Sequence, residues 1–219
     1  MWSRARRPGS AVDVTALDEF ERGLRARIGS PAFVRPFVCE GSPLECRAFI
    51  VGSNPATALE LDYWSFWERG YGFHRTIWAE ASRAQRRAAG KAEITPTRRM
   101  LGRIMKEAAP MRCLDTNVFS TPTPAERDLA PGLRRTDVFD FVLDAVRPAA
   151  LLAHGKEASD HLRRLLGAEQ LSPEHFDPVP TPWGSMRVMA VRHLSRGWSY
   201  GQAEGLGRAL RDAAAEPAS

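Results

Sequence analysis

Four short, largely apolar segments alternate along the chain with segments of helical periodicity, and this alternation constrains the fold more than any other sequence feature. Short apolar runs of this kind are typical of strands buried on both faces, and strands separated by helices usually pair in parallel. We therefore predict an α/β fold: a single domain with three α/β/α layers around a central four-stranded parallel sheet. The predicted strands are residues 47–51, 111–115, 149–153 and 186–191.

Apolar residues at helical spacing predict the helices around these strands. Thr97 is expected to be the N-cap of the helix that follows it. Residues 31–43 are interrupted by prolines, and no regular element is predicted there. We divide the chain into a flexible basic arm, residues 1–12, and one α/β domain, residues 13–219. Further helices are expected at residues 13–28, 138–146 and about 200–214, and after Gly155.

The positive charge of the chain is carried almost entirely by arginine. The formal net charge is +5, and only Lys91, Lys106 and Lys156 are lysines among the 31 Lys+Arg residues. Arginine suits bidentate phosphate contacts and stacking better than lysine does. Codon bias in the source genome explains the excess equally well, so the charge alone indicates only that a polyanion would not be repelled.

The apolar segments and the cysteines limit the cellular locations and the cofactors that we expect for the protein. The apolar runs are far shorter than the roughly 20 residues of a membrane-spanning helix, and no signal-peptide core follows the basic first residues. Cys39, Cys46 and Cys113 are odd in number and lack CxxC spacing, which argues against a structural zinc site or a four-cysteine iron–sulfur cluster. We expect a cytoplasmic monomer with no membrane partner, no metal and no other cofactor.

Polar side chains follow each predicted strand, where an open parallel sheet forms its ligand crevice. Gly52-Ser53-Asn54-Pro55 follows the first strand, Thr116-Asn117 the second, His154-Gly155 the third and His193-Leu194-Ser195 the fourth. The sequence has no carboxylate pair for ordinary glycoside hydrolysis, no GxxxxGK[ST] or GxGxxG loop and no GxSxG nucleophile elbow. The neutral amide and imidazole groups suit recognition of a polar, uncharged ring.

Three of these segments resemble motifs of the uracil-DNA glycosylase superfamily. Gly52-Ser53-Asn54-Pro55 is similar to the Gly-x-Asn-Pro motif of its mismatch-specific and single-strand-selective branches. Asp115-Thr116-Asn117-Val118 resembles the second conserved stretch of the family. His193-Leu194-Ser195-Arg196 resembles the late His-Pro-Ser motif, with Leu194 in place of the usual proline. The resemblance covers residues 37–210.

The resemblance implies hydrolysis of the N-glycosidic bond of uracil, or of a related damaged base, flipped out of DNA. Asn54 would hold the attacking water, and a neutral His193 would donate a hydrogen bond to a carbonyl of the departing base, so these two are the expected catalytic residues. Asn117 would read the edge of the base. Gly52 and Ser53, in the first motif, complete the expected base-binding site.

An aromatic ring is expected to stack on the flipped base, and residues 63–78 are rich in aromatic side chains. Tyr63, Phe66 and Phe73 are the candidates. Phe66 has the better spacing from Asn54, whereas the sequence around Phe73 has the better local match to the mismatch-specific branch. We include both Phe66 and Phe73 among the base-binding residues.

The segment after His193 is expected to contact DNA. Ser195 would contact a phosphate or cap the last helix. Arg196 or Trp198 would act as the wedge that replaces the flipped base in the stack.

Two other functions remain open. Leu194 and the long aromatic segment also fit a superfamily member that binds nucleic acid or a free nucleobase without cleaving it. An α/β enzyme acting on a small carbonyl or nucleotide substrate would use the same strand-end groups without a basic surface. Asn54, Asn117 and His193 also have purely structural interpretations as turn or strand-end residues.

Overall fold

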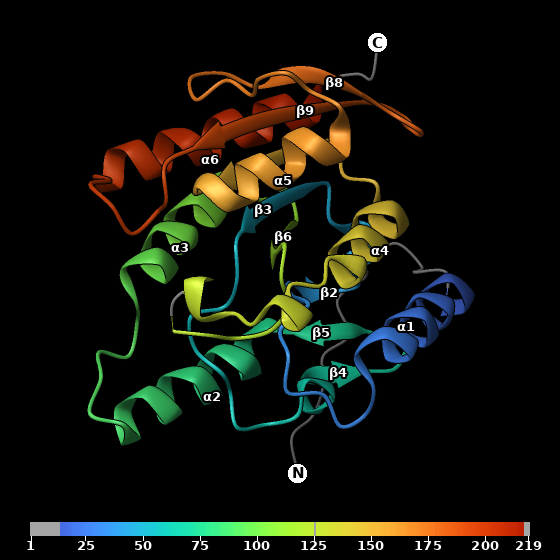
Figure 1. Ribbon diagram of the computed structural model, residues 1–219, viewed down its shortest axis with the longest axis vertical. Coiled ribbons are helices and arrows are strands. Elements are labelled where there is room, and N and C mark those ends of the chain that lie inside the picture. The colour runs from blue at the N-terminus through green and yellow to red at the C-terminus, as the bar shows by residue number, and fades with distance from the viewer. Residues whose placement is uncertain (1–13, 125, 217–219) are drawn as a thin grey trace.

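The four predicted strands lie side by side in one sheet, which further strands extend at both edges (Figure 1). The computed structural model describes residues 14–124 and 126–216, so the arm predicted for residues 1–12 lies outside the described part. The strands of this sheet, in spatial order, are β1 (Phe37–Val38), β6 (Cys113–Asn117), β3 (Ala48–Gly52), β7 (Ala150–His154), β9 (Gly184–Val191) and β8 (Asp177–Thr181). The four central strands are parallel, whereas β1 and β8 pair antiparallel at the edges.

The predicted number of four strands is wrong, because the described residues form a sheet of six. β1 has only two residues and follows Pro36, so it carries too little periodicity to be recognised. β8 has the sequence Asp-Pro-Val-Pro-Thr, and a proline cannot donate a backbone hydrogen bond to a neighbouring strand. Such a segment is tolerated at the edge of a sheet, where β8 lies.

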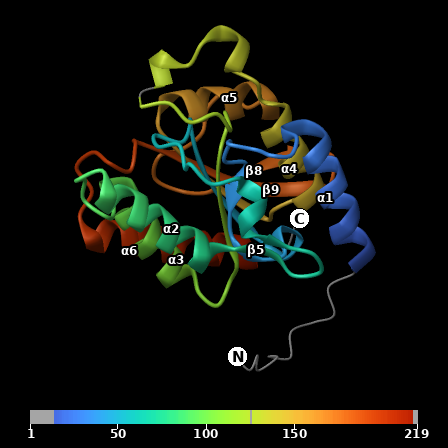
Figure 2. The same cartoon turned by 90° about the horizontal axis from the view of Figure 1, so that it is seen from below.

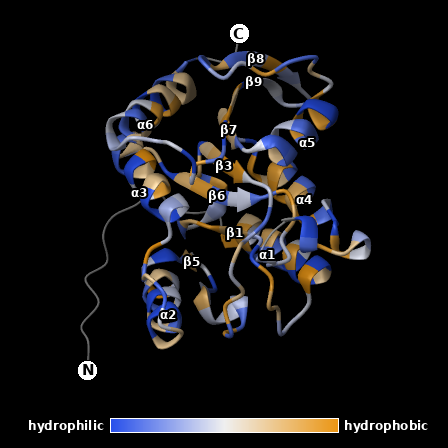
Figure 3. Cartoon of the chain, turned by 60° about the vertical axis from the view of Figure 1, so that its left-hand side comes forward, coloured by the Kyte–Doolittle hydropathy of each residue, from blue (hydrophilic) through white to orange (hydrophobic). Residues whose placement is uncertain are grey.

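The side chains of the central strands alternate between two apolar clusters, one on each face of the sheet. Ala48 and Ile50 of β3 pack in the cluster that holds residues of α3 and α6, whereas Phe49 and Val51 pack in the cluster that holds residues of α1, α4 and α5. Figure 3 shows these strands, largely in the hydrophobic colour, between the two groups of helices. The helices are α1 (Val14–Ile28), α3 (Pro96–Ala108), α4 (Asp137–Val146), α5 (Lys156–Leu166) and α6 (Tyr200–Ala215).

Helix α3 begins two residues earlier than predicted. Thr95, not Thr97, is the N-cap, since its side chain accepts a hydrogen bond from the Arg98 backbone N–H (3.2 Å). Pro96 then takes the first helical position, where its missing N–H costs nothing. This start places Arg98 in the first turn of α3, at the end of the helix that faces the strand ends.

A second, three-stranded sheet that the sequence did not predict packs beside the first. It consists of β2 (Glu40–Gly41), β5 (Gly72–His74) and β4 (Trp67–Glu68), and α2 (Arg75–Ala88) continues directly from β5 (Figure 2). Gly72 has a φ of +106°, and a Cβ atom there would lie 2.3 Å from the Gly41 carbonyl oxygen, so only glycine allows the two strands to approach.

The described helices and the cysteines complete the outline of the fold. None of the helices in residues 14–124 and 126–216 is long and apolar enough to cross a membrane. Cys39, Cys46 and Cys113 are free thiols, and the first two are buried.

Candidate functional site

Three neighbouring strands end at the same level, and each brings a glycine or a polar residue to this edge of the sheet. Gly52, the last residue of β3, is in register with Asn117, the last residue of β6. On the other side of β3, Val51 is in register with Ala153 of β7, so His154 follows one position further on. The parallel pairing thus brings together residues that are far apart in the sequence, as the strand-end argument predicted.

Gly52 allows Asn117 and His154 to approach each other. A Cβ atom at this position would lie 2.9 Å from His154 Cε1 and 3.0 Å from a terminal atom of the Asn117 side-chain amide. Gly52 is buried and is not part of the cavity lining described below. The structure therefore makes it the spacer beneath two polar side chains rather than a surface against which a base would lie.

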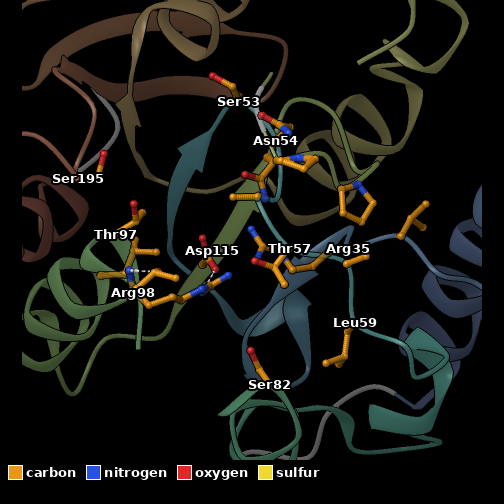
Figure 4. Close-up of a pocket in the computed structure, with 18 of the residues that line it drawn as sticks. Arg35, Ser53, Asn54, Thr57, Leu59, Ser82, Thr97, Arg98, Asp115 and Ser195 are labelled. Carbon is orange, nitrogen blue, oxygen red and sulfur yellow. Dashed lines mark hydrogen bonds and ion pairs between the residues drawn. The ribbon is translucent and has the colours of Figure 1, made fainter. Parts of the chain in front are cut away.

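A cavity of about 630 Å³ opens beyond these strand ends. Figure 4 shows Ser53 and Asn54 at one end of it and Leu59 and Ser82 at the other. The predicted site residues that line the cavity are Ser53, Asn54, Phe66, Asn117, His193, Ser195 and Arg196, whereas Gly52, Phe73 and Trp198 do not line it.

Asn54 is held in the cavity wall through the nitrogen of its side chain. Nδ2 donates to the hydroxyl oxygen (2.7 Å) and the carbonyl oxygen (3.1 Å) of Thr123. The segments that carry these two residues are also joined by their backbones, because the Thr123 N–H donates to the Pro55 carbonyl (2.9 Å). This orientation turns Oδ1 of Asn54 away from Thr123, as a hydrogen-bond acceptor.

His193 lies at the mouth of the cavity, with its ring oriented by Ser195. The Ser195 backbone N–H donates to His193 Nδ1 (3.2 Å), and the Ser195 hydroxyl oxygen lies 2.8 Å from the same atom. Because Nδ1 accepts from a backbone N–H, the neutral ring carries its proton on Nε2. Burial, and then the charge of Arg196, lowers the pKa of His193, which favours this neutral form.

Asn117 is only 5% exposed and has partners on both sides of its amide. In the amide orientation that satisfies both groups, its nitrogen donates to the Asn54 carbonyl oxygen (3.2 Å), and its oxygen accepts from Arg35 Nη2 (2.9 Å). One donor hydrogen and one lone pair of the amide are thus used within the protein, and one of each remains for a ligand.

The aromatic candidates differ in their positions. Phe66 lines the cavity together with Tyr63 and Trp78. Phe73 is fully buried between Phe37, Tyr63 and Phe66, with ring centroids 5.2 to 6.0 Å away, so the expectation that it stacks on a base is wrong. It is a core residue of the second sheet.

Residues 192–198 form a turn at the mouth of the cavity, which we call the rim turn. The Arg196 backbone N–H donates to the His193 carbonyl (3.0 Å), and Gly197 has a φ of +66°. Arg192 Nη2 donates to the Gly197 carbonyl (2.6 Å) and braces the turn. Arg196 is exposed and lines the mouth of the cavity.

The expectation that Ser195 caps the last helix is wrong, whereas the wedge role of Trp198 stays a prediction. Trp198 packs against the apolar cluster of α3 and α6, with the Arg192 guanidinium 4.9 Å from its ring centroid, and so does not reach the cavity. Ser195 does not cap the last helix, because Ser199 forms a capping box with Gln202 at the start of α6.

Three charged residues that were not predicted as site residues, Arg35, Arg98 and Asp115, line the cavity beside Asn117 and His154. Asp115 is buried, whereas Arg35 and Arg98 are partly buried, and we call these five residues the inner wall of the cavity. Arg98 forms an ion pair with Asp115, whose side chain is 3% exposed. Figure 4 shows Arg35 and Arg98 reaching toward Asp115 from opposite sides.

Arg35 reaches the inner wall because of the unpredicted strand β1. Phe37 of β1 pairs antiparallel with Thr116 of β6, so the residues before Phe37 lie level with the end of β6. The Arg35 backbone N–H also donates to the Ser120 carbonyl (2.8 Å). The one sequence signal that pointed to this position was an arginine beside an apolar pair in a proline-rich stretch, which is weak.

Burial sets the ionisation of the inner wall. It lowers the pKa of Arg35 to about 9, and repulsion by Arg98 acts in the same direction. Burial, and then His193, lowers the pKa of His154 to about 3, so that this ring is neutral at neutral pH. Its ring centroid lies 5.1 Å from that of His193, at an interplanar angle of 74°.

Comparison with known proteins adds no assignment. No protein-family model matches the chain, and no curated protein matches its sequence. Among the described residues, no group of three or more His, Cys, Asp and Glu side chains is placed to hold a metal ion.

Proposed function

We propose that the protein is a DNA glycosylase-like hydrolase that cleaves the N-glycosidic bond of uracil, or of a related damaged base, flipped out of DNA. The orientation of His193 carries the proposal. With Nδ1 occupied by the Ser195 N–H, a neutral His193 has Nε2–H as its donor, at the mouth of the cavity that also holds Asn54. A neutral donor and an amide acceptor in one cavity are the groups that such a hydrolysis needs.

In the proposed reaction the bond between the sugar carbon and the base nitrogen breaks, and its electron pair remains on the base. His193 Nε2–H donates to a carbonyl oxygen of the base, where part of the negative charge accumulates; such a donor contributes about 3–4 kcal/mol. Asn54 Oδ1 accepts a hydrogen bond from water, whose oxygen bonds to the sugar carbon. The proton that this water loses goes to solvent, and the released base takes one up.

The cavity and its mouth support the choice of substrate. Tyr63, Phe66 and Trp78 offer aromatic surface for a planar base, and stacking contributes about 1–3 kcal/mol per base. Ser195 and Arg196 are exposed at the mouth, in positions suited to phosphate contacts. The proposal includes the three-layer α/β/α arrangement, DNA as the partner of a cytoplasmic monomer, and hydrolysis by water and side chains of this chain alone.

Oligonucleotide cleavage tests the proposal directly. Single- and double-stranded oligonucleotides carrying uracil are incubated with the protein and treated with alkali, which cuts the strand at an abasic site. We expect cleavage by the wild type, a loss of about 10²–10³-fold in His193→Ala, and a loss in Asn54→Ala. His175→Ala is the matched control, because His175 is exposed and lies outside the cavity lining.

The result that contradicts the proposal is an intact strand for uracil, hypoxanthine and mismatched bases alike, with protein that is folded by circular dichroism. Equal activity of the His193→Ala and His175→Ala variants would contradict the role given to His193.

Binding without cleavage is the second candidate function, and the state of Asn117 favours it. Both sides of that amide already have partners within the protein, which leaves it less free to read a base than expected. Tight binding of a uracil-containing oligonucleotide with no strand cleavage, unchanged in Asn54→Ala, would select this candidate. Any appreciable release of free base would exclude it.

A further inference from the structure

The inner wall contains two guanidinium groups to which the proposed hydrolysis assigns no task. Arg98 is paired with Asp115, and Arg35 donates to Asn117. Arg35 Nε and Arg98 Nη2 are nevertheless buried, and neither has a hydrogen-bond partner within residues 14–124 and 126–216. Buried donors without partners are rare in native proteins and indicate a site for an acceptor.

The charges of the inner wall do not balance. Arg35 and Arg98 bring two positive charges, and Asp115 brings one negative charge. His154 is neutral because of its low pKa, and the pKa of His193 is also lowered. Of the other charged residues that line the cavity, Glu93 is paired with Arg87 and Lys156 with Asp160. The remaining charged lining residues are Arg86, Glu157 and Arg196.

The guanidinium groups of Arg35 and Arg98 both lie near the ring of Trp78. The Arg98 guanidinium carbon lies 4.7 Å from the Trp78 ring centroid, and that of Arg35 lies 5.9 Å from it. Trp78 is 8% exposed and lines the cavity. Cation–π contact of this kind holds a guanidinium while leaving its N–H groups free to donate in the plane.

We propose that Arg35 and Arg98 form an anion-binding site for the departing base, an oxo-substituted heterocycle that carries a negative charge after the glycosidic bond breaks. This inference rests on the proposed function and adds a role to it. The electron pair of the broken bond spreads from the ring nitrogen to the carbonyl oxygens, and the two guanidinium groups donate to these oxygens. Neither arginine transfers a proton; the base anion later takes one from water.

Two physical arguments favour an anion over a neutral ring at this site. Hydrogen bonds from guanidinium to a charged acceptor are about twice as strong as those between neutral groups. An anion would also offset the repulsion between Arg35 and Arg98, which contributes to the lowered pKa of Arg35. A neutral base would leave the excess positive charge of the inner wall uncompensated.

Binding of a free base tests the inference without requiring catalysis. The probe is 5-fluorouracil, because its ring nitrogen ionises at a lower pH than that of uracil, so that Arg35 is still charged when the probe is an anion. Calorimetric titration of the full chain is done below and above the ionisation of the probe. We expect the anion to bind about tenfold more tightly, or more, than the neutral form.

The variants separate this role from a structural one. Arg35→Met should abolish the preference for the anion. The variant should still fold, because burial of the Arg35 guanidinium is unfavourable in the wild type. Arg98→Met should also abolish the preference for the anion. If Arg98→Met does not fold, Arg98→Lys replaces it, because the lysine keeps a positive charge beside Asp115. Arg98→Lys should retain a reduced preference for the anion. Arg103→Met is the matched control, because Arg103 is also on α3, paired with Glu204 and 4.5 Å from the Tyr200 ring, but does not line the cavity.

The outcomes distinguish the inference from the function on which it rests. Equal binding of both forms of the probe by the wild type, or an unchanged preference in Arg35→Met, overturns the inference even if uracil is excised from DNA. Preference for the anion that is lost in Arg35→Met but kept in Arg103→Met supports the site even if no oligonucleotide is cleaved. In that case the proposed hydrolysis fails and the anion site stands.

Discussion

The inner wall and the rim turn face the same cavity but are held in different ways. The inner wall is built from strand ends and the first turn of α3, and its polar atoms contact one another inside the protein. The rim turn is largely exposed and is held by backbone hydrogen bonds and by Arg192. Changes in the inner wall should therefore alter stability together with the site, whereas a change at an exposed position of the rim turn, such as Arg196, should alter ligand contacts alone.

The largest effect on stability is expected for Asp115→Asn. This change removes the carboxylate that pairs with Arg98 and leaves largely buried positive charge without a counterion, which costs about 3–5 kcal/mol. Urea unfolding followed by circular dichroism measures the loss. Glu204→Gln, which breaks the more exposed ion pair with Arg103, should cost less than about 1 kcal/mol. Similar losses in the two variants would remove the distinction between buried and exposed ion pairs.

A smaller, pH-dependent effect is expected from His154. An unfolded histidine takes up a proton near pH 6.5, whereas the pKa of folded His154 is about 3. Between these values the unfolded state binds more protons, so stability falls as the pH is lowered from 6.5 towards 3. At pH 5 this amounts to about 2 kcal/mol.

The measurement is the difference in unfolding free energy between pH 7.5 and pH 5 for the wild type and His154→Gln. The variant should lose less stability on acidification, by about 2 kcal/mol. His175→Gln, at an exposed histidine outside the cavity lining, is measured alongside as the comparison. A pH dependence in His154→Gln as steep as in the wild type would show that His154 is not the group responsible.

The smallest effect on stability is expected in the rim turn. Arg196→Ala should leave the unfolding free energy unchanged within about 0.5 kcal/mol, since the side chain is exposed. If Arg196 contacts a phosphate, the slope of log affinity against log salt for a single-stranded oligonucleotide should fall by about 0.7–0.9. Fluorescence anisotropy across a salt series measures it, with Arg208→Ala on α6 as control. Equal slopes of log affinity against log salt for Arg196→Ala and Arg208→Ala would show that the DNA does not contact Arg196.

The fold could be predicted where the sequence pattern is long enough to be read. The central strands and helices α1 and α6 lie within a few residues of their predicted positions, because each buries a repeated apolar face. β1, β8 and the second sheet were not predicted, since two- to five-residue strands with prolines or glycines carry little periodicity. Their strands are defined by pairing with distant residues, which local patterns do not encode.

In the candidate site, too, some residues could be predicted from the sequence and others could not. The position of Asn54, Asn117 and His193 at one cavity could be predicted because parallel strands end at a common edge. Arg35 and Arg98 were missed because nothing in the local sequence indicates that they line the cavity. Arg35 reaches it through the pairing of β1, and Arg98 through the start of α3 at Thr95. Phe73 was misassigned because its sequence surroundings do not show that Phe37, Tyr63 and Phe66 enclose its ring.

The hydrogen bond from Arg192 to the Gly197 carbonyl affects the rate at which the protein can associate with a partner. A turn that is already ordered has little conformational entropy left to lose when it docks, and ordering each flexible side chain at an interface costs about 0.5–1.5 kcal/mol. Association would then be limited by diffusion and long-range charge rather than by loop rearrangement. The bound rim should superimpose on the free one to within about 1 Å in its backbone.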